Sequence, residues 1–221
     1  MRGAACGAAT VSVEVYVDFV CPWCYIGHRR LERVRAGLPA GHLPKIIWRS
    51  YQLDPEASAV PAQTAAEAMR GWYPSAAEAE ARIARIVSAG REEGLLLDLE
   101  RAQLVNTFDA HRVSHLAMEM GLAEALHERI YRAYHTEGRN IADHQELTAI
   151  AGEAGMDRTS VEAMLASDRF GSAVRADTRR ASARGINSVP SMALGNGEVH
   201  SVIQEDSALS DLLVNTPSCN G

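Results

Sequence analysis

The sequence predicts an α/β domain that is interrupted by a large block of helices. Three features of the 221-residue chain lead to this prediction. A strand, a helix and a second strand are expected near the N-terminus, and a short hairpin with a final helix near the C-terminus. Between them, residues 63–184 have helical spacing and no convincing strand. The chain is 47% hydrophobic and 23% charged, which is ordinary for a globular core and excludes a disordered or low-complexity protein.

The first three elements form a predicted β-α-β unit. In residues 11–20, valines at every second position alternate with more polar residues, which is the period of a strand. The tetrapeptide C-P-W-C (residues 21–24) follows at once, and the apolar residues after it have helical spacing. Pro22 suits the first turn of a helix, because its missing N–H would have no partner there. Residues 46–53 form a short apolar and aromatic second strand. The cysteine pair is therefore expected at the strand-to-helix turn.

Helix start signals divide the long middle block, which is about half of the chain and is placed to form a lid. Each signal is a side chain that can accept a hydrogen bond from the first turn of the helix. These signals are Ser75 with Glu78, Asn106, Asp143 with Glu146, and Asp157.

The last part of the chain returns to strands. Residues 191–194 and 199–203 predict two strands, and the Gly-Asn-Gly sequence at 195–197 predicts the tight turn between them. A short helix over residues 205–214 is expected to close the domain.

Charge and hydropathy exclude several classes of partner. The chain has 22 basic and 28 acidic residues, a net charge of −6, so nucleic acid is not expected as a partner. No stretch approaches the roughly 18 to 20 apolar residues of a membrane helix, so no membrane is expected either. Glu14 and Asp18 interrupt the apolar run that a secretory signal would need. We therefore expect a cytoplasmic protein, with residues 1–10 and 216–221 as flexible tails.

The C-P-W-C sequence is the sharpest chemical signal. Four cysteines are too few and too unevenly placed for a disulfide scaffold. Cys21 is expected at the start of a helix, where free backbone N–H groups and the positive end of the helix dipole stabilise a thiolate. Cys24, one turn further on, can reach a mixed disulfide formed on Cys21. The spacing therefore predicts Cys21 as the nucleophile and Cys24 as the resolving thiol.

Three other uses of the pair are less favoured. A zinc site would need two more ligands, and His111 and His115 share a helical face but lack the glutamate of H-E-x-x-H. Attachment of c-type haem requires histidine directly after the second cysteine, where Tyr25 stands. A buried pair without function is the third alternative.

Several other residues have two open interpretations. Asp18 either relays the proton of the resolving cysteine or is a polar residue at the end of a strand. Trp23 contacts substrate or tunes the cysteine pair. His111 and Arg112 either lie over the active site as substrate contacts or belong to a solvated helix face behind an Asn106 cap.

Two further features of the sequence also have two interpretations each. Val189-Pro190 precedes the late strand, where the proline can adopt the cis form in a turn or simply begin the strand. Cys6 and Cys219, in opposite tails, are either incidental exposed thiols or thiols that exchange with the active pair.

Four segments together resemble the DsbA-type, FrnE-like oxidoreductases of the thioredoxin superfamily. They are V-x-V-Y-V-D-F-V-C-P-W-C-Y-I-G around the cysteine pair, N-T-F-D-A-H-R from Asn106, T-E-G-R-N-I from Thr136 and G-I-N-S-V-P-S from Gly185. The resemblance implies a thioredoxin-like fold at residues 11–62 and 185–215, with a large all-helical insertion domain at 63–184.

The resemblance also implies thiol–disulfide oxidoreductase or isomerase activity. It places a cis-proline loop, here Val189-Pro190, opposite the cysteine pair, where its backbone would pair with an extended substrate by strand addition. No metal, nucleotide or organic cofactor is required. The implied partners are a thiol- or disulfide-bearing protein or a small thiol such as glutathione, and a reductant or oxidant that recycles the pair.

Two alternatives stay open. Kappa-class glutathione transferases and hydroxychromene-carboxylate isomerases are similar overall, but they need only one thiol-contacting residue near position 21, so Cys24 argues against them. A chaperone-like module would hold unfolded segments in a groove of the helical lid, with the cysteines secondary.

Overall fold

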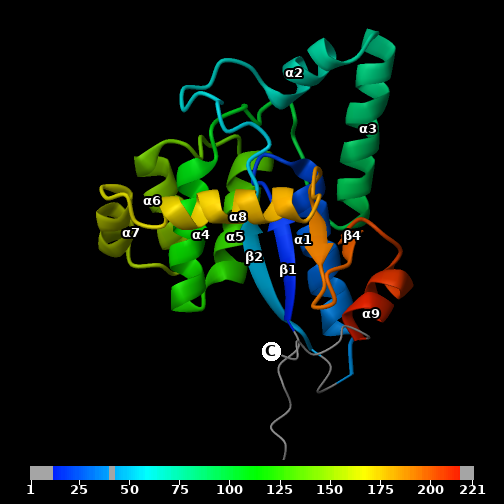
Figure 1. The fold of residues 1–221 in the computed structure, drawn as a ribbon. Helices are drawn as coiled ribbons and strands as arrows, with labels where there is room; N and C mark the ends of the chain where they lie inside the picture. Colours follow the sequence, from blue (N-terminus) through cyan, green and yellow to red (C-terminus); the bar gives the residue numbers. More distant parts are fainter. Residues whose placement is uncertain (1–11, 40–42, 215–221) are drawn as a thin grey trace, which may run out of the picture.

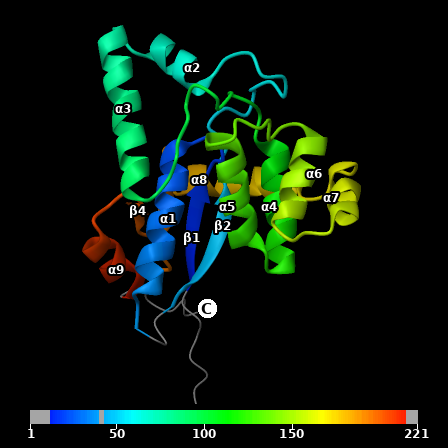
Figure 2. The ribbon, with the colours of Figure 1, turned by 180° about the vertical axis from the view of Figure 1, so that it is seen from behind.

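The computed structural model describes residues 12–39 and 43–214, which form a mixed four-stranded sheet with helices on both faces (Figures 1 and 2). In chain order, the elements are β1 (Ser12–Val17), α1 (Pro22–Ala36), β2 (Lys45–Ser50), α2 (Ala65–Trp72), α3 (Ala76–Glu92), α4 (Phe108–Met120), α5 (Ala123–His135), α6 (His144–Glu153), α7 (Arg158–Leu165), α8 (Gly171–Ala183), β3 (Ser191–Ala193), β4 (Val199–Ser201) and α9 (Asp206–Val214). The predicted α/β fold with a long helical block is confirmed. The expected tails, with Cys6 and Cys219, lie outside the described residues.

The sheet has the strand order β2-β1-β3-β4. β1 is parallel to β2 and antiparallel to β3, and β3 and β4 form the antiparallel hairpin. The first two strands end earlier than the sequence predicts. Asp18 leaves the β1 ladder, and its carboxylate Oδ2 accepts a hydrogen bond from the backbone N–H of Leu53 at 2.7 Å. The Asp18 side chain thus replaces the backbone hydrogen bonds between the two strands at the point where their chains separate.

The alternation along β1 separates two faces of the sheet. Val13, Val15 and Val17 are buried in the main core, which also contains the inner residues of α1. Tyr16 points to the opposite face, where it packs with Ala181 of α8 in a smaller cluster. Figures 1 and 2 show α8 crossing one face of the sheet and α1 lying on the other. The division of the chain into a thioredoxin-like domain and an insertion domain remains our proposal.

Most helices of the middle block begin as predicted. The side chains of Ser75, Asp143 and Asp157 each accept a hydrogen bond from the first turn of the following helix. The cap of α4 differs, because Thr107 and not Asn106 occupies the capping position. Among these helices, α2 begins with a reciprocal capping box between Thr64 and Glu67, which the sequence reading missed.

The helices α2 and α3 form a hairpin beyond the strand ends that precede the cysteine pair (Figure 1). The base of α3 is fixed to α1 because Glu93 binds Arg30 and Arg33 through ion pairs of 2.9 Å each. No helix in the described part of the chain is long and apolar enough to cross a membrane.

Candidate active site

Cys21 occupies the position directly before the first turn of α1. Its backbone is extended, with φ −85° and ψ 114°, and Pro22 follows at the first helical position as predicted. Its carbonyl accepts the backbone N–H of Cys24 at 3.0 Å, which begins the helix. The Cys21 thiol therefore lies at the positive end of the helix dipole, as the sequence predicts.

The two cysteines are free and lie in different environments. Their thiol groups are 3.6 Å apart. Cys21 is 6% exposed, whereas Cys24 is completely buried. Burial raises the pKa of the Cys24 thiol well above its usual value, and the hydrogen bond with Cys21 raises this pKa further. The Cys24 sulfur also accepts a hydrogen bond from the backbone N–H of Asp18, at 3.4 Å.

The loop before β3 faces Cys21. The Val189-Pro190 peptide bond is cis, and the Cys21 thiol donates a hydrogen bond to the carbonyl of Val189 at 3.7 Å. Gly27 on α1 permits this close packing, because a Cβ there would lie 3.0 Å from Cγ of Pro190. The structure thus brings Cys21, Cys24, Val189 and Pro190 together.

Asp18 and His111 form a buried polar pair behind the cysteines. Asp18 is completely buried, and its Oδ1 atom has no hydrogen-bond partner. That atom lies 3.3 Å from Nε2 of His111, which also lacks a hydrogen-bond partner. His111 is only 1% exposed, so the expectation that it belongs to a solvated helix face is wrong.

Arg112 is also buried, but it does not lie near the cysteines. Its guanidinium donates hydrogen bonds to the carbonyls of Met164, Ser167 and Arg169, and it forms an ion pair with Asp109. These contacts tie α4 to the last turn of α7 and to the segment that follows it. The solvated-face expectation is therefore wrong here too, and the structure does not bring Arg112 to the active site.

Asn106 and His115 each have a structural role. The Asn106 side chain donates to the carbonyls of residues 55 and 57 at 3.0 and 3.1 Å, which holds the segment after β2. His115 contacts Ser50 and Asp177, each at 3.2 Å, and not the partner of His111. Among the described residues, no group of three or more His, Cys, Asp or Glu side chains could hold a metal ion.

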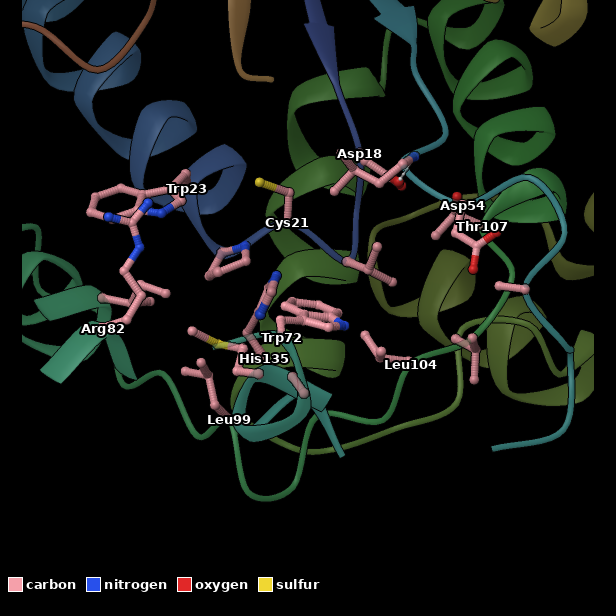
Figure 3. A pocket seen from close by; sticks show the side chains of 18 of the residues that line it. Asp18, Cys21, Trp23, Asp54, Trp72, Arg82, Leu99, Leu104, Thr107 and His135 are labelled. Atoms are coloured by element: carbon pink, nitrogen blue, oxygen red, sulfur yellow. Dashed lines mark hydrogen bonds between the residues drawn. The ribbon is translucent and has the colours of Figure 1, made fainter. Parts of the chain in front are cut away.

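A cavity of about 420 Å³ opens beside Cys21 (Figure 3). Trp23 of α1, Met69 and Trp72 of α2, and Arg82 and Ile86 of α3 line it, so the helical hairpin forms much of its wall. The sequence marks Cys21, Pro22, Trp23 and Asp18 among the lining residues, but it does not mark those of α2 and α3. One feature of the sequence could have indicated this wall of the cavity, namely the isolated Trp72 in an alanine-rich helical segment. The Trp72 side chain is 65% exposed.

Buried aromatic and histidine side chains surround the cysteines, and one of them, His135, also lines the cavity (Figure 3). The rings of Phe19 and His111 have centroids 4.9 Å apart, and those of Tyr25 and Tyr131 are stacked at 5.1 Å. Burial lowers the pKa of His28 to about 3 and that of His135 to about 3. These imidazoles are therefore neutral at physiological pH.

Comparison with known proteins agrees with this geometry. The family described as the DSBA-like thioredoxin domain matches residues 12–212. A probable DsbA oxidoreductase from Streptomyces coelicolor, SCO1869, is similar in structure, with a TM-score of 0.86 and 31% sequence identity. That similarity covers 93% of this chain and 89% of SCO1869.

Two more distant structures share the fold. The cytosolic disulfide reductase DsbM from Pseudomonas aeruginosa, solved with GSH, is 20% identical with a TM-score of 0.62, over 92% of this chain and 97% of DsbM. A 2-hydroxychromene-2-carboxylate isomerase is 19% identical with a TM-score of 0.62, over 86% of this chain and 87% of the isomerase. At these identities the likeness concerns the fold alone.

Proposed function

This chain belongs to the DSBA-like thioredoxin domain family, and from that premise we propose that it is a dithiol–disulfide oxidoreductase in which Cys21 attacks and Cys24 resolves. The observation that carries the proposal is the asymmetry of the pair. Cys21 lies at a helix N-terminus beside a cavity, and Cys24 is completely buried behind it with its sulfur within reach. An external disulfide can therefore meet Cys21 first.

In the reducing direction, the Cys21 thiolate attacks one sulfur of a substrate disulfide, and the other substrate sulfur leaves as a thiolate. Cys24 then loses its proton and attacks the sulfur of Cys21, which releases the second substrate thiolate and forms the Cys21–Cys24 disulfide. Two electrons pass from the dithiol to the substrate. In the oxidising direction the same steps run backwards, and the reduction potential of the pair decides which direction a compartment favours.

The second step requires a group that removes the proton of Cys24. Burial makes this proton hard to remove, since it raises the pKa of the thiol. The backbone N–H of Asp18 binds the Cys24 sulfur, and the charge of the buried Asp18 carboxylate acts on the Cys24 thiol and raises its pKa. The Oδ1 atom of this carboxylate is without a hydrogen bond in the described structure. We propose Asp18 as the proton acceptor and His111 as the residue that positions it.

The cis-proline loop supports the binding of an extended substrate. The carbonyl of Val189 lies beside the Cys21 thiol, so a substrate backbone could pair with this segment while its sulfur meets Cys21. Trp23 would contact the substrate on the other side of the cysteine, because it lines both the cavity and the surface next to Pro190. Pro190, Val189 and Trp23 therefore complete the proposed site.

The proposed partners are a thiol- or disulfide-bearing protein or a small thiol, together with a recycling reductant or oxidant. The complex of DsbM with GSH supports glutathione as one candidate. The cytosolic setting of that reductase supports our proposal of a cytoplasmic protein. The proposed steps use only the two thiols and the side chains around them, without a metal, nucleotide or organic cofactor.

The test is the reduction potential of the Cys21–Cys24 pair. The protein is equilibrated across a series of glutathione poises and alkylated, and the modified cysteines are identified by mass spectrometry. We expect one two-electron transition that forms the Cys21–Cys24 disulfide, and in a Cys24→Ser control only a mixed disulfide between Cys21 and glutathione.

If no disulfide forms between the two cysteines at any poise, the oxidoreductase proposal fails. Assays for a glutathione-dependent transferase or isomerase would then follow. A Cys21→Ser variant that suppresses aggregation of an unfolded protein as well as the unaltered chain would favour the chaperone-like alternative.

A further inference from the structure

The cavity beside Cys21 is more apolar than disulfide exchange itself requires. Its walls include Trp23, Met69, Trp72, Ile86, Leu99 and Leu104. Trp72 is highly exposed at the end of α2, so it offers a ring to a molecule that enters from solvent. A cavity of about 420 Å³ with such walls suits a small ligand with an apolar body. Glutathione, a charged tripeptide, would bury little apolar surface there.

One cation enters this apolar wall. Arg82 of α3 is half-buried and is the sole Lys or Arg among the lining residues. Within residues 12–39 and 43–214 its guanidinium has no hydrogen bond or ion pair. Arg70 on α2 is different, since it binds Glu80 at 2.7 Å and also binds Glu100. A guanidinium left without an acid beside an apolar cavity can bind an anionic group of a ligand.

The charged residues at the two ends of the cavity determine how a bound ligand is oriented. Figure 3 shows Arg82 reaching toward Trp23 on one side of Cys21, and Asp54 with Thr107 on the other side. Asp54 would repel a carboxylate from its own end of the cavity. An anionic ligand would therefore place its charge at Arg82 and its apolar body against Trp72, with its sulfur at Cys21.

We propose that this cavity binds small disulfides or thiols that combine an apolar, ring-sized body with a carboxylate, and that Trp72 and Arg82 determine this specificity. The inference rests on the proposed function and names its substrate class. The Cys21 thiolate attacks the ligand disulfide and one ligand thiolate leaves. Cys24 then gives up its proton, attacks the sulfur of Cys21 and releases the second ligand thiolate, so two electrons reach the ligand.

The experiment compares three disulfides in single-turnover reactions with the reduced protein. 5,5′-Dithiobis(2-nitrobenzoic acid) has aromatic rings and carboxylates, 4,4′-dithiodipyridine has neutral aromatic rings, and 2-hydroxyethyl disulfide is small, neutral and without a ring. Cys6→Ser and Cys219→Ser changes in the full-length chain leave only the active pair to react. Oxidation of the pair is measured by alkylation and mass spectrometry of acid-quenched samples.

The ratio of the rates of two disulfides is compared between variants, because that comparison cancels the intrinsic reactivity of each disulfide and of the cysteine pair. Arg82→Gln is expected to lower the ratio of the carboxylated to the neutral aromatic disulfide about tenfold, which is the size of a charge-assisted contact near the surface. Trp72→Ala is expected to lower the rates of both aromatic disulfides about tenfold relative to 2-hydroxyethyl disulfide, because their rings lose an apolar surface.

Arg91→Gln is the matched control, since Arg91 is an exposed arginine on the same helix and does not line this cavity. It should leave every ratio unchanged. The inference is overturned if Arg82→Gln and Arg91→Gln have the same ratios, or if Trp72→Ala slows all three disulfides equally. If the unaltered pair reduces none of the three disulfides, the proposed function itself fails. Reduction of all three without these ratio changes overturns only the substrate class.

Discussion

The two sides of the cysteine pair differ far more than their separation along the chain suggests. The open side, with Cys21, Trp23, Trp72 and Arg82, borders the cavity. The buried side holds Cys24, Asp18 and His111 and has almost no contact with solvent. One turn of helix separates the two sides. The comparison shows that chemically identical thiols obtain different roles from their surroundings. Burial raises the pKa of Cys24 and closes it to substrate, whereas Cys21 borders the cavity.

Replacing each cysteine with serine is the strongest test of the difference between the two sides of the pair. Cys21→Ser removes the accessible sulfur and should lower the rate of disulfide reduction on the order of 1000-fold or more, as expected for loss of a nucleophile. Cys24→Ser should retain the first attack and accumulate a mixed disulfide on Cys21. Mass spectrometry of the protein after reaction with 2-hydroxyethyl disulfide detects that adduct. If Cys24→Ser forms no adduct, the assigned roles are wrong.

A smaller effect is expected from the carboxylate on the buried side. Asp18→Asn keeps the shape but removes the proton acceptor, so the resolving step should slow about 100-fold, at the low end for general base catalysis. Because burial raises the pKa of Cys24, the residual rate should rise with pH as hydroxide replaces the carboxylate.

The measurement is the lifetime of the mixed disulfide after rapid mixing, at several values of pH. Asp211→Asn, which replaces an exposed carboxylate on α9 outside this cavity, is the matched control and should leave the resolving step unchanged. Equal lifetimes in Asp18→Asn and the unaltered protein would remove Asp18 from the mechanism.

The smallest predicted effect concerns the buried histidines, which should make the stability of the protein depend on pH. Burial lowers the pKa of His28, His127 and His135, so they bind protons mainly after unfolding. Their contribution is fully present above the unfolded pKa of about 6.5 and is lost as the pH falls toward the folded pKa. For His28 and His135 that window extends down to a pH of about 3.

His28 and His135 should each lower the free energy of unfolding by about 2 kcal/mol between pH 7 and pH 5. Urea unfolding at both pH values measures the difference, and a His135→Gln variant should show a smaller one. A His144→Gln variant, which replaces an exposed histidine, is the control. If His135→Gln loses as much stability between the two pH values as the unaltered protein does, this account is incorrect.

Much of the fold could be predicted because local sequence patterns and tertiary structure agree. The alternating valines, the proline after Cys21 and the Gly-Asn-Gly turn each determine a local conformation that the completed sheet retains. Cys21, Cys24 and the Val189-Pro190 loop could be found because a motif or a proline marks them in the sequence.

The surroundings of the cysteines could not be predicted in the same way, because long-range packing decides burial. His111 and Arg112 appear in the sequence as polar residues near a helix start, yet one lies against Asp18 and the other binds carbonyls more than 50 residues away. The role of Arg82 could not be predicted for a similar reason. Nothing in the spacing of α3 indicates that this arginine would reach the cavity beside Cys21 without an acid partner.

The attachment of α3 has a consequence for how such a protein can diversify. Glu93 anchors the base of this helix to Arg30 and Arg33, while Arg82 and Trp72 lie further along the hairpin, away from that anchor. The cysteines, by contrast, are supported by the sheet and by α1. Exchanging the hairpin above a retained Glu93 anchor could therefore give the same redox pair a new ligand, so selectivity and electron transfer can evolve as separate parts.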